Sequence, residues 1–177
     1  LKDQADLEGL TGYHHRKYSP AQTDFLVSKV RSLESNGLIV PTFSAIDSPV
    51  VIAKKSNGDF RLCIDYRKLN DITSRINYPM PDIKEILQRM EGKKCFVQMD
   101  LRDGFWQLGC AKESRYLTAF TTPEGKYEWT RLPMGLKNSP MHFQRAMRQV
   151  LRGLEKDVEI FIDDLILYGD NDKELLG

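Results

Sequence analysis

The chain has 177 residues, of which 41% are apolar and 29% charged, and its formal net charge is +1. A chain of this length can bury one substantial core or two small packed subdomains, so we expect a soluble globular protein. No apolar stretch approaches the roughly 18 residues of a membrane span, and no signal-peptide pattern is present. We therefore expect no membrane partner and a cytoplasmic or nuclear setting.

Charge is unevenly distributed along the chain. Residues 51–75 and 126–152 carry a net positive charge, whereas residues 155–177 are acidic. Basic surfaces beside an acidic segment suit a protein that holds a phosphate backbone and its cations together, although solvated mixed-charge faces give the same pattern. The chain has three widely spaced cysteines, Cys63, Cys95 and Cys110. Their spacing indicates free thiols and argues against both a disulfide framework and a zinc site.

The first predicted element is a scaffold helix. The adjacent His14 and His15, in the polar segment before it, are interpreted as loop residues and not as ligands. Residues 19–22 form a capping box with proline at the first helical position, and Asn36-Gly37 ends the helix. The residues expected on its buried face are Leu26, Val30 and Leu33.

A long β-hairpin is predicted next. Residues 48–55 and 60–67 have strand composition on either side of a turn that contains Asn57-Gly58. Lys55 and Arg61 flank this turn, so the hairpin presents two cations near its tip. Held over a metal site, they could clamp a triphosphate, because arginine binds phosphate oxygens bidentately. The alternative is an edge hairpin whose lysines and arginines keep it soluble.

Helices and strands alternate through the middle of the chain. One helix begins at Pro81 and is closed by Gly92, and another begins at Ser139-Pro140. The residues expected on their buried faces are Ile83, Ile86, Leu87 and Met90 in the first, and Phe143, Met147, Val150 and Leu154 in the second. Strands are predicted over residues 95–101, 116–121 and 126–131.

Two adjacent carboxylates, Asp163 and Asp164, interrupt the apolar run of residues 160–168. This run predicts a hairpin of two short buried strands with the acidic pair at its tip. If the 95–101 strand lies beside the hairpin, Asp100 comes close to both. Carboxylates that are crowded together and partly removed from water repel each other, so they need a cation to stay charged. Three oxygen donors suit Mg²⁺, and such a site is typical of phosphoryl chemistry with two metal ions. The alternative is a turn at which both aspartates face water.

No glycine-rich phosphate loop links the strands to helices, which argues against a Rossmann or P-loop fold and favours a sheet with helices on one face. Five blocks of sequence, in order, resemble the motifs of reverse transcriptases, most of all those of gypsy-type long-terminal-repeat retrotransposons and related retroviruses. The blocks are residues 48–51 (SPVV), 65–70 (DYRKLN), 100–105 (DLRDGF), 132–140 (LPMGLKNSP) with Phe143-Gln144, and 161–164 (FIDD).

This resemblance implies an α+β fold of the right-hand polymerase type, with an antiparallel palm sheet backed by helices. Fingers would comprise residues 1–74 and 108–138, interleaved with a palm over residues 75–107 and 139–177. The thumb, the connection and any ribonuclease H domain would lie beyond the last residue. Because the chain begins with leucine and not with methionine, we expect a fragment of a longer polyprotein that binds duplexes weakly on its own.

The resemblance also implies roles for individual residues. The catalytic acids and metal ligands would be Asp100, Asp163 and Asp164, with the backbone carbonyl of Leu101 as a further metal ligand. The nucleotide-binding residues would be Lys55 and Arg61 at the triphosphate, Phe105 blocking a ribose 2′-OH, and Met134 near the sugar. The template-binding residues would be Arg67 and Asn70.

Three residues depart from the family pattern. Phe161 stands where tyrosine is usual, which removes a hydroxyl that could touch the primer strand but leaves both acids in place. Asp103 and Trp106 replace the serine and histidine common in gypsy-type sequences. Asp103 would add an anion near the site, and the family pattern gives Trp106 no role.

The implied function is RNA-directed DNA polymerisation, in which a primer 3′-OH attacks the α-phosphate of a deoxynucleoside triphosphate with two Mg²⁺ ions, or Mn²⁺, as cofactor. The expected partners are an RNA or DNA template with its primer, dNTPs, and the rest of a parent polyprotein in a retroelement particle. Two alternatives stay open: a catalytically silent binding or interaction module derived from a reverse transcriptase, and a palm polymerase of another template class.

Overall fold

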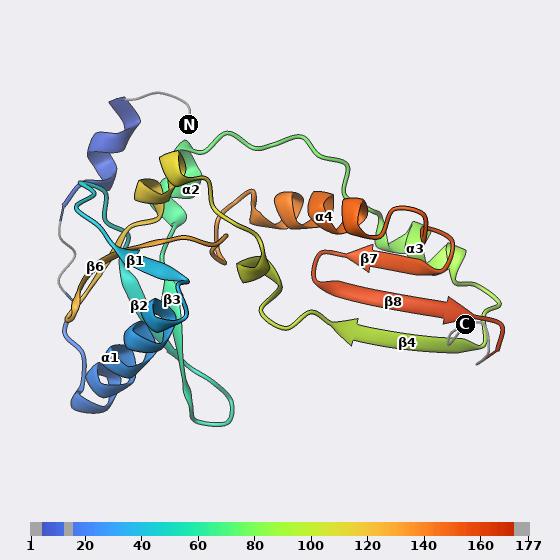
Figure 1. Ribbon diagram of the computed structural model, residues 1–177, viewed down its shortest axis with the longest axis horizontal. Helices are drawn as coiled ribbons and strands as arrows, with labels where there is room; N and C mark the ends of the chain where they lie inside the picture. The colour runs from blue at the N-terminus through green and yellow to red at the C-terminus, as the bar shows by residue number, and fades with distance from the viewer. Residues whose placement is uncertain (1–4, 13–15, 172–177) are drawn as a thin grey trace. The chain divides into compact units, whose positions relative to one another are not determined.

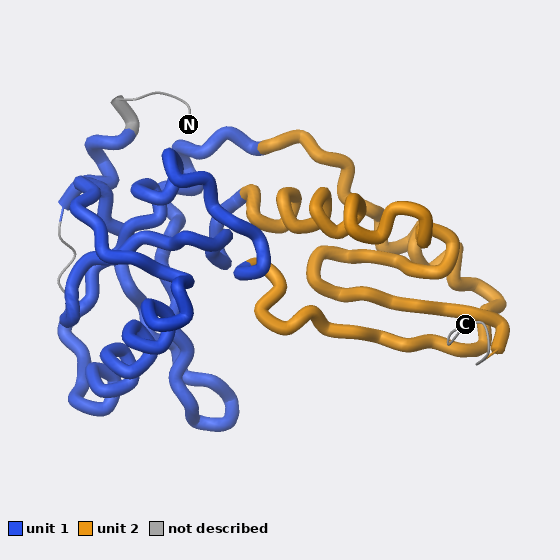
Figure 2. Tube along the Cα trace, in the orientation of Figure 1, with its two compact units in different colours: residues 1–75, 106–137 blue, residues 76–105, 138–177 orange. Residues whose placement is uncertain are grey.

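The chain forms two compact units, which Figure 2 shows in different colours. The residues that the computed structural model describes are 5–12 and 16–171 (Figure 1), so His14 and His15 lie outside them. Unit 1 comprises Leu1–Arg75 and Trp106–Lys137, and unit 2 comprises Ile76–Phe105 and Asn138–Gly177. These bounds lie within two residues of the segments predicted for fingers and palm, and the assignment of those two names stays a prediction.

Unit 1 contains a sheet with the strand order β1-β6-β5 and a separate hairpin, β2-β3, and the strands of both pair antiparallel. Its elements, with η for a 3₁₀ helix, are η1 (Ala5–Leu10), α1 (Pro20–Ser35), β1 (Ile39–Pro41), β2 (Val50–Lys54), β3 (Phe60–Ile64), α2 (Arg67–Ile72), η3 (Lys112–Thr118), β5 (Phe120–Thr122) and β6 (Gly125–Trp129).

The capping box predicted for α1 is confirmed. The Ser19 hydroxyl accepts a hydrogen bond from the Gln22 backbone N–H (3.3 Å), and the Ser19 N–H donates to the Gln22 side chain (3.0 Å). The predicted apolar face of the helix is buried and joins the core of unit 1, which includes Leu26, Val30, Leu33, Ile39, Val50, Phe120 and Trp129. Each such side chain contributes about 1.5–3 kcal/mol by leaving water.

The hairpin predicted around Asn57-Gly58 is formed by β2 and β3. Gly58 has φ +91°, a conformation that glycine adopts without a steric penalty. The second strand ends at Ile64, three residues earlier than predicted, and Arg67 begins α2. The physical reason is local, because the Asp65 carboxylate accepts the Arg67 backbone N–H (3.2 Å) and turns the chain out of the sheet.

The strand predicted over residues 116–121 is also wrong, since η3 occupies its first part and β5 begins at Phe120. Thr118 explains the change. Its hydroxyl donates to the Arg115 carbonyl (2.7 Å) and accepts from the Trp129 backbone N–H (3.0 Å). A side chain thus satisfies the backbone groups that a longer strand would have paired.

Unit 2 contains a sheet with the strand order β4-β8-β7, antiparallel throughout, and α3 and α4 lie on its β7 side (Figure 1). Its elements are α3 (Ile83–Arg89), β4 (Cys95–Asp100), α4 (Ser139–Val150), β7 (Val158–Phe161) and β8 (Asp164–Gly169), and the short helix η2 (Gly104–Gln107) follows β4. Helices with antiparallel sheets confirm the predicted α+β class. Among the described residues, none of the helices combines the length and apolar character that crossing a membrane requires.

The buried face predicted for α3 is only partly right. Ile86 is buried, but Ile83 and Leu87 are more than half exposed. The helix is rotated so that Arg89, one turn after Ile86, reaches the buried Glu159 of β7, with Arg89 Nη2 2.9 Å from Glu159 Oε2. A carboxylate buried this deeply needs a partner, and the ion pair therefore takes precedence over the apolar stripe.

The ends of both helices in unit 2 also differ from prediction. Helix α3 begins after Asp82, whose side chain accepts the Lys84 backbone N–H (2.8 Å), and not at Pro81. In α4, Phe143 is buried as predicted, whereas Val150 is exposed and ends the helix. The predicted Leu154 lies beyond the helix and is half exposed.

Candidate active site

The three aspartates predicted to form the site lie at one end of the unit 2 sheet. Strands β4 and β8 pair so that Asp100 lies directly opposite Asp164. Asp163 occupies the two-residue turn between β7 and β8, and its carbonyl accepts a long hydrogen bond from the Leu101 N–H (3.5 Å). Asp164 is therefore the first residue of β8, and Asp163 alone of the acidic pair is at the tip.

The charge of the three aspartates is not balanced by an ion pair in the described part of the chain. Within the described residues, no lysine or arginine forms an ion pair with any of the three. Asp164 Oδ1 accepts a hydrogen bond from Gln98 Nε2 (3.2 Å), two positions before Asp100 on the same face of β4. These oxygen donors fit a divalent cation that takes part of its shell from water and substrate phosphates. Among the described residues, however, no three histidine, cysteine, aspartate or glutamate side chains are grouped closely enough to hold a metal ion, so water or substrate would have to complete any metal shell here.

The carbonyl of Leu101, implied as a further metal ligand, takes part in the turn after β4. It accepts a hydrogen bond from the Gly104 N–H (3.0 Å), which leaves one lone pair for another partner. Asp103, within this turn, has φ +54°, a left-handed conformation that aspartate tolerates better than most residues. The turn thus fixes the direction of the chain between Asp100 and Phe105.

The turn that carries Asp163 is strained. Ile162 has φ +61°, and a β-branched side chain rarely adopts this left-handed region. Such a conformation costs on the order of 1–3 kcal/mol. A positive φ at the first of two turn residues, and not at the second, is the pattern of the tight type II′ hairpin turn. The strain therefore lies directly beside the acidic pair.

Gln144 of α4 holds this turn in place. Its side-chain amide donates to the Ile160 carbonyl (3.0 Å) and accepts from the Ile162 N–H (2.7 Å). Gln144 itself is 1% exposed, and the two hydrogen bonds are partly buried. Gln144 belongs to one of the sequence motifs, but the motif does not indicate a role for it. An amide side chain on the buried face of a helix, next to Phe143, is the signal that could have indicated one.

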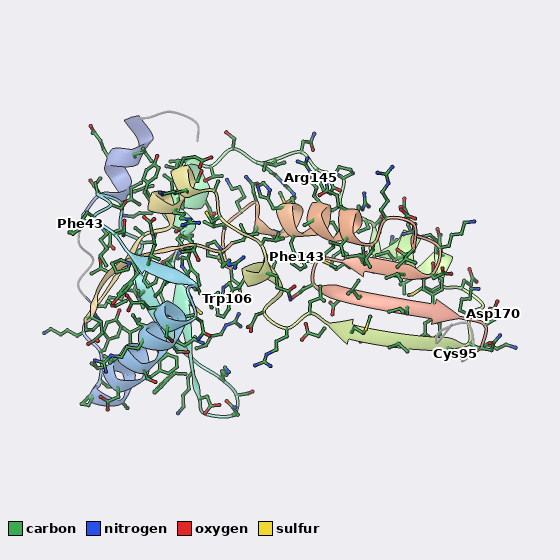
Figure 3. All side chains as sticks on the ribbon, in the orientation of Figure 1. Phe43, Cys95, Trp106, Phe143, Arg145 and Asp170 are labelled. Atoms are coloured by element: carbon green, nitrogen blue, oxygen red, sulfur yellow. The ribbon has the colours of Figure 1, made fainter. Side chains whose placement is uncertain are left out.

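Phe105 is held by packing within unit 2. Its ring lies 5.1 Å from that of Phe143, centroid to centroid, and Phe143 extends from α4 (Figure 3). Gly104 makes this approach possible, because a Cβ at that position would lie 3.1 Å from Phe143 Cζ. The ring that is predicted to select deoxynucleotides is therefore supported on one side by a second aromatic ring.

Two of the predicted nucleotide-binding residues meet within unit 1. Arg61 Nη2 of β3 lies 3.5 Å from Met134 Sδ, in the loop that follows β6. Lys55 is exposed in the hairpin turn, and its backbone N–H donates to the Asp59 carbonyl (2.7 Å). Arg61 is also exposed, so both cations are accessible to a phosphate.

Arg67, a predicted template contact, is already paired with a carboxylate. Its guanidinium donates to both oxygens of Asp65, at 2.8 and 2.6 Å, while its side chain stays 86% exposed. This interaction lowers the pKa of Asp65 from 3.8 to about 2. The pair orients the guanidinium at the surface, and the template role of Arg67 stays a prediction.

Asn70, the other predicted template contact, forms a hydrogen bond at each end of its side-chain amide inside unit 1. Its Nδ2 donates to the Gly135 carbonyl (2.8 Å), and its Oδ1 accepts from the Lys137 backbone N–H (2.7 Å). Both partners belong to the loop that carries Met134. The structure thus gives Asn70 a positioning function for this loop, and its template role also stays a prediction.

The chain is similar in sequence to a known protein family and to several viral and transposon polyproteins. The family described as reverse transcriptase (RNA-dependent DNA polymerase) matches residues 52–177. The chain is 33% identical over 159 residues to the enzymatic polyprotein of Figwort mosaic virus, covering 88% of the chain and 24% of the polyprotein. It is 39% identical over 159 residues to the retrovirus-related Pol polyprotein from transposon gypsy of Drosophila melanogaster. This match covers 86% of the chain and 15% of the polyprotein.

A solved structure has the same fold. The foamy viral protease-reverse transcriptase dRH in complex with ds DNA matches 94% of this chain with a TM-score of 0.79 and 26% identity, over 30% of its own chain. The chain thus spans about a quarter or less of the curated polyproteins that it matches, and under a third of this structure.

The role of Gln144 can be tested by Gln144→Met, which keeps the length of the side chain and removes both hydrogen bonds. We expect the free energy of unfolding to fall by about 1–3 kcal/mol, because a partly buried backbone carbonyl loses its donor and a backbone N–H loses its acceptor. Urea denaturation followed by circular dichroism measures the change. Gln149→Met, at an exposed position of the same helix, is the matched control, and equal stability of the two variants would contradict the assignment.

The ion pair between Asp65 and Arg67 predicts a specific pH dependence. The folded pKa of Asp65, about 2, lies below its ordinary value of 3.8. The pair therefore contributes stability above pH 3.8 and loses it as the pH falls toward 2. We expect Asp65→Asn to be less stable than the native chain at neutral pH and to lose less stability over this acidic interval. Urea denaturation across a pH series tests this, with Asp24→Asn on α1 as control, and parallel curves for the native chain and Asp65→Asn would refute it.

Proposed function

Because the chain belongs to the reverse transcriptase family, we propose that it carries the catalytic and nucleotide-binding residues of an RNA-directed DNA polymerase. The reaction joins a deoxynucleoside monophosphate from a dNTP to a primer 3′-OH and releases pyrophosphate. The observation that carries the proposal is the register of β4 on β8, which pairs Asp100 with Asp164 beside Asp163. A catalytically silent module would have no need of three acids without ion-pair partners at one end of a sheet.

Asp100, Asp163 and Asp164 would hold two Mg²⁺ ions, or Mn²⁺, with the Leu101 carbonyl as a further ligand. Bound metal would supply the charge that lowers the pKa of the primer hydroxyl and stabilises the leaving pyrophosphate. The residues of the chain itself would position the acids. Gln144 fixes the strained turn under Asp163, so the acid does not have to be ordered when substrate arrives.

Residues of two kinds, cationic and apolar, would bind the incoming nucleotide. Lys55 and Arg61, both exposed, would bind the triphosphate oxygens, and Met134 beside Arg61 would contact the sugar. Phe105, supported by the ring of Phe143, would block a ribose 2′-OH. A rigid aromatic wall discriminates against an added hydroxyl only if it cannot move aside, and the packing on Phe143 supports that rigidity.

The nucleic-acid partner would be a primer annealed to an RNA or DNA template. The foamy viral relative, whose structure was solved with ds DNA, supports duplex binding by this chain. Arg67, with its exposed guanidinium, would contact template phosphate, and Asn70 would position the neighbouring loop. Binding through phosphates releases counterions, so affinity should weaken steeply with salt.

Asp163→Asn tests the catalytic role of the acidic pair. We expect primer extension by the parent polypeptide to fall at least about 100-fold, because a metal ligand loses its charge, with circular dichroism unchanged. We also expect this chain to lose Mg²⁺-dependent binding of a fluorescent dNTP. Asp157→Asn, an exposed carboxylate just before β7, should behave as the native protein. Extension at a near-native rate by Asp163→Asn would remove the role, and absence of any Mg²⁺-dependent nucleotide binding would favour the silent module.

Phe105→Ala tests the sugar gate. Removal of the ring should let ribonucleotides enter and lower the preference for dNTPs over rNTPs by about 10–100-fold. Single-nucleotide incorporation kinetics with each substrate measure the ratio. The control is Phe43→Ala, a fully exposed phenylalanine of unit 1 (labelled in Figure 3). Unchanged discrimination in Phe105→Ala would eliminate the gate assignment and reopen the choice of template class.

A further inference from the structure

A cavity of about 220 Å³ lies within unit 1, between α1, β3 and the loop that follows β6. Aliphatic side chains of α1 and β3 form part of its wall, and the remainder includes Trp106 and Trp129. Trp106 has no role in the family pattern. The cavity is smaller than the 300–1,000 Å³ typical of drug-sized ligands, so it fits a ligand of one or two rings.

The charge on the lining of this cavity has one sign. Lys29 and Arg61 both line it, and no aspartate or glutamate does. Neither cation forms an ion pair with a carboxylate of the described residues. The Lys29 ammonium lies 5.6 Å from the centre of the Trp106 ring, and Arg61 Nη2 lies 3.5 Å from Met134 Sδ. Two cations beside apolar walls attract an anion that also has an apolar body.

The aromatic part of the wall is well ordered by packing. The rings of Trp106 and Trp129 stack with centroids 5.5 Å apart and an interplanar angle of 29°. They are the two tryptophans of the sequence. Trp106 Nε1 is buried without a hydrogen-bond acceptor among the described residues, so packing and the Lys29 cation hold this ring. The intrinsic tryptophan emission of the protein therefore comes from this one cavity.

We propose that this cavity is a binding site for a small aromatic anion, such as an aryl carboxylate, that regulates nucleotide binding. The ring of the ligand packs on the tryptophans and aliphatic side chains, and its negative charge pairs with Lys29 and Arg61. Arg61 and Met134 also belong to the proposed nucleotide site, so an occupied cavity competes with the dNTP for Arg61. This regulatory part rests on the proposed function, whereas binding to the cavity does not.

Quenching of tryptophan emission tests binding directly. The probe is 4-nitrobenzoate, whose nitroaromatic ring quenches indole, and the neutral 4-nitrobenzamide has the same size without the charge. We expect saturable quenching by the carboxylate and an affinity for the amide on the order of tenfold weaker, the usual effect of one charge-assisted hydrogen bond. Quenching that does not saturate, or equal affinities for the two probes, would overturn the site without any substitution.

Substitutions then locate the probe. Lys29→Met keeps the aliphatic stem over Trp106 and removes the charge, and it should weaken 4-nitrobenzoate binding about tenfold. Lys112→Met, at an exposed position of η3 away from the lining, should bind as the native chain does. Trp106→Phe removes no hydrogen bond and leaves Trp129 as the single reporter, and quenching should persist. Equal affinities in the Lys29→Met and Lys112→Met variants would overturn the location.

Primer extension separates the regulatory claim from the proposed function. In an active parent polypeptide, 4-nitrobenzoate should raise the KM for dTTP and leave kcat unchanged. Extension unaffected by saturating probe would refute competition at Arg61. If no extension occurs even without the probe, the proposed polymerase function fails, and the quenching experiment still decides whether the cavity binds an aromatic anion.

Discussion

The register of β4 against β8 is the constraint on which the acidic site depends. Side chains alternate between the faces of a strand, so a slip of one residue would carry Asp100 to the opposite face from Asp164. The hydrogen bond from Gln98 to Asp164 lies on the same face, and its partner would be lost in the same slip. The pairing that builds the sheet therefore also builds the site, and the two cannot be varied independently.

Helix α4 supplies the second level of support in unit 2. Through Gln144 it holds the strained turn at Ile162, and through Phe143 it supports the ring of Phe105. Adjacent residues of one helix thus reach the turn before the acids and the short helix after Asp100. Strain of this kind persists only where the surrounding structure over-determines it. Gln144, whose amide makes both contacts with the turn, is itself buried.

Unit 1 places its polar groups on loops that other side chains position. Asn70 holds the loop of Met134, which lies against Arg61, and Arg61 in turn lines the cavity that contains both tryptophans. A change in the cavity therefore has a short physical route to the cation proposed to bind triphosphate. The route consists of direct contacts within one compact unit, which is the kind of connection that energetic coupling requires.

Short-range signals in the sequence determined the elements whose causes are local. The capping box of α1, the Asn57-Gly58 turn and the apolar run around the acidic pair each involve residues a few positions apart, and the ordered motifs indicated the family. The tertiary structure alone decided which strand lies beside the acids, why Ile83 and Leu87 face outward, and that Gln144 holds the turn. Each of these depends on a partner that is distant in the chain, such as Glu159 for Arg89. The periodicity of a segment reports only which of its own residues share a face, so it cannot predict the position of such a partner.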